Sequence, residues 1–162
     1  MSEESGLEAG ADQRVQVQFN VERIYLKDVS FESPVTPEIF AEQASPDVQV
    51  DLNTRVNALE DERHEVVLSL TVTVKQASDG RVAYLVEVQQ ARLFSIKGAE
   101  GGSLQQVLGI HCPNTLFPYL REAVDDLVIK GGFPPLRLAP VNFEALYQQA
   151  LAQRQQEGAE PH

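Results

Sequence analysis

The chain contains little of several residue types, and each shortage excludes a class of protein. A single cysteine, Cys112, rules out an intrachain disulfide framework and suits a reducing compartment. No apolar run approaches the roughly 20 residues of a membrane-spanning helix, and the first residues lack the apolar core of a signal peptide. We therefore expect a cytoplasmic protein without direct membrane insertion.

Cations are also scarce, because 13 Lys and Arg residues accompany 24 Asp and Glu residues, giving a formal net charge of -11. Nucleic acids and anionic membranes bind basic patches, so we expect neither as a partner. Residues 1–13 hold part of this charge and are expected to form a disordered acidic tail. Residues 14–157 are then one domain, and residues 158–162 a disordered C-terminal tail.

The chain lacks the residue combinations that catalysis or a metal site requires. His111 and Cys112 are adjacent, but no further ligand accompanies them, and Cys112 is expected to be a buried packing residue. The glycine-rich stretch 98–103 lacks the Lys-Ser/Thr of a phosphate-binding loop. Asp125 and Asp126 are expected to be solvated on the polar side of a helix. We predict no enzyme activity and no cofactor.

Apolar and polar residues alternate in four segments, which is typical of strands with one buried face. The segments are residues 14–31, 48–58, 65–75 and 82–91, and the last continues toward Ile96. In the first segment, Tyr25 falls on the apolar side, whereas Ile24 and Leu26 are apolar exceptions on the polar side. Four such strands predict an α+β fold, in which helices pack on one face of a four-stranded antiparallel sheet.

Helical spacing of apolar residues follows the last strand. Three helices are expected, at residues 103–111, 112–130 and 142–155. Pro113 suits the first turn of the second helix, and Gly131 with Gly132 should end it in the left-handed conformation. The prolines of residues 133–141 predict an extended strap, and Asn142 should cap the last helix.

Two kinds of surface remain, and each has an ordinary and a functional interpretation. The polar sheet face holds carboxylates and the apolar Leu85, and it is either a solvated face or a docking surface. Its carboxylates are Glu22, Asp28, Glu32 and Glu87. Apolar, proline-rich residues around Phe40, residues 48–52 and residues 133–138 form either ordinary packing or a binding groove.

Four sequence blocks carry a resemblance to a known family. They are IYLKDVSFESP (24–34), VEVQQARLFSIKG (86–98), CPNTLFPYLRE (112–122) and GGFPPLRLAPVNFEALY (131–147). In this order they bracket nearly the whole chain, which resembles the SecB family of bacterial protein-export chaperones. The resemblance implies a homotetramer, a dimer of dimers, that uses no ATP. It would hold precursor proteins unfolded and pass them to SecA at the Sec translocon.

The resemblance also implies roles for particular residues. SecA docking matches Asp28, Glu32, Leu85 and Glu87. The client groove matches Phe40, Val48, Val50 and Leu52. Assembly of the oligomer matches Val86, Val88 and Gln90. Ala44 stands where some relatives have a tryptophan, which leaves the depth of an aromatic subsite open. Val86 stands where some have cysteine, a swap of similar volume.

Two other functions stay open at this point. Some relatives of the SecB family serve toxin–antitoxin systems, and genomic neighbours would identify that role. A carrier of small apolar ligands would use a pocket between the sheet and the helices. Saturable one-to-one binding of a small molecule would favour the carrier, whereas binding of unfolded but not folded polypeptide would favour the chaperone.

Overall fold

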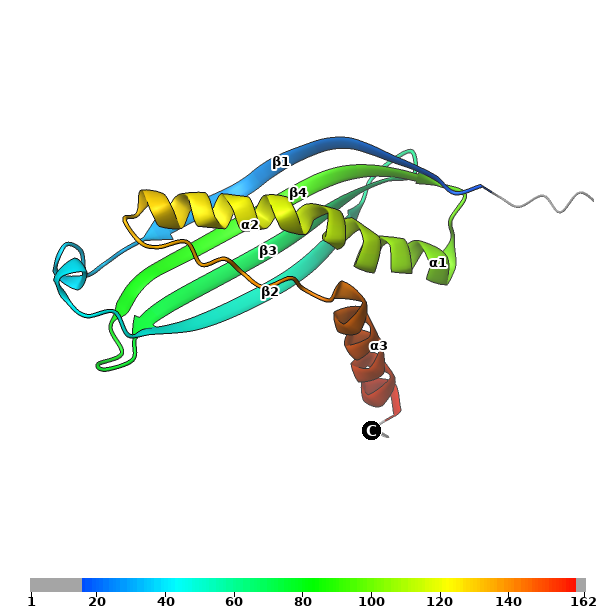
Figure 1. Ribbon diagram of the computed structural model, residues 1–162. Helices are drawn as coiled ribbons and strands as arrows, with labels where there is room; N and C mark the ends of the chain where they lie inside the picture. The colour runs from blue at the N-terminus through cyan, green and yellow to red at the C-terminus, as the bar shows by residue number, and fades with distance from the viewer. Residues whose placement is uncertain (1–15, 160–162) are drawn as a thin grey trace, which may run out of the picture.

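The computed structural model describes residues 16–159 and contains one antiparallel sheet with its helices on one face (Figure 1). The strands are β1 (Gln18–Glu32), β2 (Pro46–Ala58), β3 (Arg63–Gln76) and β4 (Val82–Lys97), in the spatial order β1-β4-β3-β2. A 3₁₀ turn, η1 (Glu38–Ala41), lies in the crossover loop between β1 and β2. The predicted α+β fold is confirmed. We call the helix-covered side of the sheet its inner face and the opposite side its outer face.

The helical layer is formed mainly by one long helix that crosses β4 and β3 (Figure 1). It consists of α1 (Gly101–Gln106), a π-helical turn η2 (Val107–His111) and α2 (Cys112–Lys130). The prediction of two separate helices, at residues 103–111 and 112–130, is therefore wrong. The π turn ends at His111, two residues before Pro113, and the helix continues through this proline although its nitrogen carries no N–H. Within residues 16–159, no helix is long and apolar enough to cross a membrane.

The core lies between α2 and the inner faces of β3 and β4. Alternate residues of β3, from Val66 to Val74, are buried against an apolar stripe of α2. That stripe consists of Leu116, Leu120, Val124 and Val128. Cys112 is fully buried, and this burial raises the pKa of its thiol to about 12. The prediction of a buried packing cysteine is confirmed.

β1 departs from simple alternation because it contains two bulges. Its pairing with β4 shifts register between Val21 and Arg23 and again between Leu26 and Asp28. Each extra residue exchanges the two faces of the strand. Ile24 pairs with inner-face Arg92 and packs on the core, whereas Tyr25 turns outward. The expected faces of Ile24, Tyr25 and Leu26 were therefore wrong.

Two glycines end α2 for different reasons. Gly132 has a φ of +89°, the left-handed conformation that was expected. Gly131 keeps helical dihedrals, but a side chain there would overlap the ring of Phe31. The chain then turns back alongside α2 as the extended strap (Figure 1).

Asp125 fastens this strap to α2 and is half-buried, so the expectation that it is solvated was wrong. Its Oδ1 accepts hydrogen bonds from the backbone N–H groups of Leu136 at 3.1 Å and Arg137 at 3.3 Å. Directly after these two N–H groups the strap turns, because Arg137 has a φ of +51°, in the left-handed region.

The last helix, α3 (Phe143–Ala159), begins where the sequence predicted. Asn142 caps it, because its Oδ1 accepts a hydrogen bond of 3.0 Å from the N–H of Ala145. α3 continues to Ala159, two residues into the segment expected to be a C-terminal tail. The expected acidic tail at residues 1–13 lies outside the described residues.

On the outer face, side chains from β1 and β2 donate hydrogen bonds to Glu65 of β3, which lies between these strands in the sheet. Tyr25 Oη donates to its carboxylate from β1, Lys27 Nζ donates at 2.8 Å, and Asn57 Nδ2 donates at 2.7 Å from β2. The hydrogen bonds from Lys27 and Tyr25 lower the pKa of Glu65 to about 2. Burial, together with the contact with Glu65, raises the pKa of Tyr25 to about 12.

We expect Glu65→Gln to remove part of the acid sensitivity of the fold. The folded pKa lies below the value of about 4.3 for an unfolded chain, so the stabilisation is present above that pH. It is lost as the pH falls toward about 2. Urea unfolding followed by circular dichroism between pH 2 and 7 measures this. Glu22→Gln, which breaks an exposed pair with Arg63, is the control. Equal pH slopes for both variants would contradict the assignment.

We expect Asp125→Ala to loosen the strap. Two hydrogen bonds to a partly buried carboxylate are lost, so the free energy of unfolding should fall by about 1–3 kcal/mol. Hydrogen exchange at the amides of Leu136 and Arg137 should accelerate most. The neighbouring variant Asp126→Ala removes only an exposed ion pair with Lys130 and is the control. Unchanged exchange at both amides in Asp125→Ala would show that the carboxylate does not hold the strap.

Candidate functional site

The inner face of β2 is apolar but largely uncovered. Val48 pairs with Val74 and Val50 with Val72 on this face. Val48 is 44% and Val50 46% exposed, whereas Val74 is 4% and Val72 0% exposed. The difference arises because α2 packs over β3 and β4, one strand short of the sheet edge. The two predicted groove residues therefore lie side by side on an open apolar strand.

A first hollow, the loop-side hollow, lies at the start of β2 and has a volume of about 420 Å³. Its walls come from the crossover loop, the inner faces of β2 to β4, and the strap. They include Phe40, Ala44, Val48, Tyr84, Phe133 and Leu136. The Phe133 ring lies 4.7 Å from that of Tyr84 and 5.2 Å from that of Phe40, between centroids. A cluster of three aromatic rings from three separate segments is thus present without a tryptophan.

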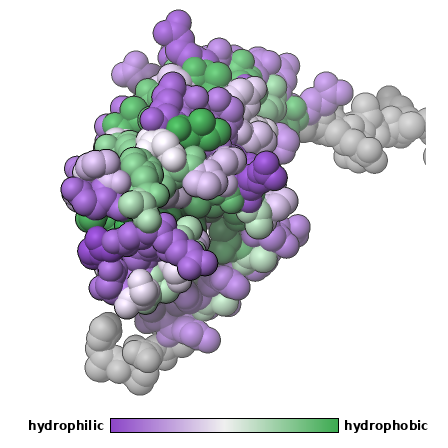
Figure 2. All heavy atoms as spheres, turned by 60° about the vertical axis from the view of Figure 1, so that its left-hand side comes forward, coloured by the Kyte–Doolittle hydropathy of each residue, from purple (hydrophilic) through white to green (hydrophobic). Residues whose placement is uncertain are grey.

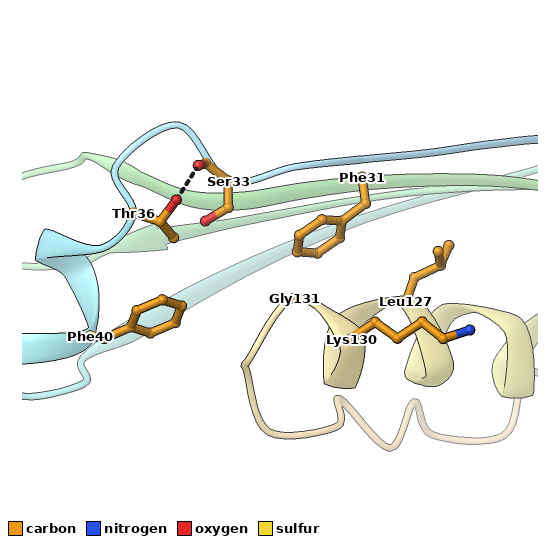
Figure 3. Close-up of a pocket in the computed structure, with 7 residues that line it drawn as sticks. All are labelled: Phe31, Ser33, Thr36, Phe40, Leu127, Lys130 and Gly131. Carbon is orange, nitrogen blue, oxygen red and sulfur yellow. Dashed lines mark hydrogen bonds between the residues drawn. The ribbon is translucent and has the colours of Figure 1, made fainter.

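A second hollow of about 430 Å³ adjoins the first across the ring of Phe40 (Figure 3). Figure 3 shows Phe40 from the crossover loop, Phe31 from β1 and Leu127 from α2 around this space. Lys130 also lines it, but its amine pairs with Asp126 at 2.7 Å. Sequence reasoning missed Phe31 and Leu127 as surface-hollow residues, because both fall on stripes that predict core.

Polar contacts hold the crossover loop against the β3–β4 hairpin. Buried Gln76 accepts a hydrogen bond from Ser45 N–H at 3.0 Å and donates to Gln43 O at 3.3 Å. Arg81 donates to both Glu42 and Asp79, and these hydrogen bonds lower the pKa of both carboxyls. These contacts therefore fix the crossover-loop wall of the loop-side hollow. Seen from this side, hydrophobic side chains gather in patches bordered by hydrophilic ones (Figure 2).

Further along β2 lies the α3-side hollow, with a volume of about 540 Å³. The predicted groove residue Leu52 and its neighbour Val56 form one wall. The other walls come from η2 and α3 and include Leu108, Gly109, Phe143, Leu146, Tyr147 and Ala150. The open stretch of β2 therefore runs between two hollows.

The four predicted docking residues lie together on the outer face, near the end of the sheet that carries the β3–β4 hairpin. Glu32 is directly opposite Leu85, and Ser30 is opposite Glu87 and donates to it at 3.5 Å. Asp28 is opposite Gln89, one step further along. Asp28, Glu32 and Glu87 are exposed, and Leu85 is half-buried. Their predicted polar parity is confirmed.

Glu22, assigned to the same carboxylate face from the sequence, lies away from this group. It pairs with Arg63 at 2.7 Å. Sequence reasoning missed Asp47 and Asp51 of β2, which alternate with the inner-face valines and so share the outer face with the docking group.

The three predicted assembly residues lie inside the protomer. Val86 and Val88 are buried on the inner face beneath α2, and Gln90 is buried and donates to the backbone oxygen of Tyr25 at 3.1 Å. They are not a surface that another chain could touch directly. If these three residues affect assembly of the oligomer, they do so indirectly, through the positions of α2 and β1, against which they pack.

No group of three His, Cys, Asp or Glu side chains within residues 16–159 is placed to hold a metal ion. His111 instead lies edge-on to the ring of Phe19, with 4.9 Å between centroids. The described surface carries apolar hollows on the inner face and exposed carboxylates on the outer face.

Comparison with known proteins agrees with this arrangement. Residues 12–154 match the family model of SecB, described as preprotein translocase subunit SecB. A protein-export protein SecB of Marinobacter nauticus is 55% identical over 151 residues, which cover 93% of this chain and 90% of that protein. Its counterpart in Ectopseudomonas mendocina is 52% identical over 158 residues, 98% of this chain and 97% of that protein.

A solved structure shares the fold at low sequence identity. It is the SecB-like chaperone of Mycobacterium tuberculosis in complex with a ChAD peptide from the HigA1 antitoxin. The TM-score is 0.64 at 18% identity, over 76% of this chain and 90% of that one. The family match and the relatives at about half identity over nearly the whole length decide the assignment: this chain belongs to the SecB family of protein-export chaperones.

Proposed function

We propose that this export chaperone acts in the cytoplasm without ATP, holding precursor proteins unfolded and delivering them to SecA. The observation that carries the proposal is the open inner face of β2 between two apolar hollows. Apolar burial is not directional, so such a surface accepts many sequences, provided that they are unfolded and expose apolar side chains.

The dimensions of the surface suit an extended polypeptide. Val48 lines the loop-side hollow and Val56 the α3-side hollow, eight residues further along β2. At about 3.3 Å per residue, this separation is roughly 26 Å, so an extended client segment of about eight residues reaches both hollows. Several modest apolar contacts along one client then add to a tight complex.

The outer face supports a second binding event that leaves the client surface free. Asp28, Glu32 and Glu87 form an exposed negative group on a rigid sheet, with Leu85 among them. Such a group attracts a basic partner segment, which we propose to be part of SecA. Since inner and outer residues alternate along the same strands, client and SecA occupy opposite faces.

We further propose assembly as a homotetramer. Apolar residues on the inner side of β1 and on α2 are exposed in the single chain. They include Val21, Leu26, Val29, Tyr119 and Ile129. Scattered exposed apolar residues are normal, but a group on one edge strand and the adjoining helix favours association. Sedimentation velocity at micromolar concentration should give the mass of four chains.

We expect the double change Val48→Ser and Val50→Ser to weaken client holding at least tenfold. Burying each valine contributes roughly 1.5 kcal/mol or more, and serine contributes little of this. The test is light scattering of an aggregating unfolded precursor, together with its affinity. Gln49→Ser lies between the two valines but on the outer face and should leave holding unchanged. Normal holding by the double variant, with an intact fold, would place the client elsewhere.

We expect Asp28→Ala, Glu32→Ala and Glu87→Ala to reduce SecA binding stepwise, while client holding persists. Each exposed pair contributes only about 0.2–1 kcal/mol, so the carboxylates act as a group, and binding should weaken with salt. Binding to SecA at low and high salt, run beside the aggregation assay, measures both activities.

A matched triple variant separates position from net charge. Glu38→Ala, Glu122→Ala and Glu144→Ala remove three exposed carboxylates away from the outer face and should bind SecA normally. Equal loss in both triples would mean that only total charge matters, and wild-type binding by the first triple would refute the docking assignment.

A further inference from the structure

α3 is held to the body of the protein mainly through its first turns. Phe143 is 3% exposed and packs edge-on against Phe117 of α2, with 6.0 Å between ring centroids. Among residues 144–158, Tyr147 and Leu151 are the half-buried positions, and the others are exposed. The rest of the helix projects away from the sheet (Figure 1). Phe143 and Tyr147 therefore provide most of the attachment.

Tyr147 rests in a notch that a glycine leaves in the π-helical turn η2. A Cβ atom on Gly109 would lie 2.6 Å from Cδ2 and 2.9 Å from Cε2 of Tyr147. Gly109 has no positive φ, so its backbone conformation does not require glycine. A helical glycine costs roughly 0.5–1 kcal/mol relative to alanine, which calls for a reason at this position. Glycine is required here for steric reasons, because the Tyr147 ring occupies the volume that a side chain on Gly109 would fill.

Both residues also line the α3-side hollow, opposite Leu52 of β2. Leu146 and Ala150, on either side of Tyr147 along the helix, form the outer wall of the same hollow. The depth to which Tyr147 sits in the notch thus sets how close this wall lies to β2.

We infer that Gly109 and Tyr147 are positioning residues that hold α3 at a fixed distance from β2 and so limit the size of the apolar side chain that the α3-side hollow admits. If the ring is displaced, α3 pivots about Phe143, the wall recedes and the hollow widens. The packing of Tyr147 against Gly109, which we call the seat, follows from the geometry. Its role in client selection rests on the proposed chaperone function.

Adding one methyl group tests the seat. Gly109→Ala forces the ring out of the notch, and hydrogen exchange at the amides of residues 147–157 should become at least tenfold faster. Gly102→Ala adds the same group to another helical glycine that has nothing within 4 Å and should leave this exchange unchanged. Tyr147→Ala empties the notch without adding atoms and should reproduce the faster exchange, even if Gly109→Ala folds poorly. Wild-type exchange in Tyr147→Ala, or equal exchange in the two glycine variants, would overturn the seat.

Two labelled peptides test the effect on selection. They share one Ser- and Lys-based sequence and differ only in carrying leucines or tryptophans at the same apolar positions. Gly109→Ala should shift the ratio of affinities toward the tryptophan peptide at least threefold relative to Gly102→Ala. An unchanged ratio despite faster exchange would refute the size limit. If the wild-type protein holds neither peptide nor any unfolded precursor, the chaperone function is wrong, and the exchange measurement still decides the seat.

Discussion

The rest of the structure depends on the burial of one long helix against a sheet that is wider than the helix. Strands lie about 4.8 Å apart, so the axes of four strands span roughly 14 Å, whereas a helix with its side chains is about 10 Å wide. α2 therefore covers the two central strands, β4 and β3, and leaves the apolar inner face of β2 exposed. The proposed client surface is the part of the apolar sheet face that this one helix does not cover.

The segments around this gap narrow it without closing it. The crossover loop, held by Gln76 and Arg81, brings Phe40 to one end of β2, and the strap, held by Asp125, brings Phe133 and Leu136 beside it. At the other end, α3 stands against η2 and leaves Leu52 and Val56 in reach of solvent. Because these covers come from three separate segments, the hollows can differ in shape while the sheet beneath them stays rigid.

The faces of β2, of β3 and of β4 from Tyr84 onward could be predicted from the sequence because regular strands alternate with a period of two. Val82 is the exception, since a register shift places it opposite Lys75 and so on the other face from Tyr84. Val48, Glu87 and Val88 each lie on the face that this period predicts. β1 could not be predicted in this way, since its bulges depend on pairing with β4, and the apolar exceptions Ile24 and Leu26 do not by themselves locate the extra residues. The joined helix was missed because Pro113 is ordinarily a starting residue and a π turn has no clear sequence pattern.

Contacts made over long sequence distances account for the other differences. Asp125 sits among polar neighbours on its helix, and only the returning strap, eleven residues later, turns it into a hydrogen-bond acceptor for backbone groups. The same applies to Gly109, because the need for glycine at this position arises only from its contact with Tyr147 of α3. The loop-side hollow likewise needs aromatic rings from the crossover loop, β4 and the strap, which are far apart in the sequence.

The paired bulges of β1 constrain how this protein can change length during evolution. The first bulge exchanges the faces of the strand and the second restores them, so Phe19 and Phe31 both point inward while Asp28 and Glu32 point outward. Deleting either extra residue alone would turn Phe31 to solvent and drive Glu32 toward the core. Insertions and deletions in this strand are therefore tolerable only as compensating pairs, and a lineage that lost one bulge would have to lose the other to keep its acidic face.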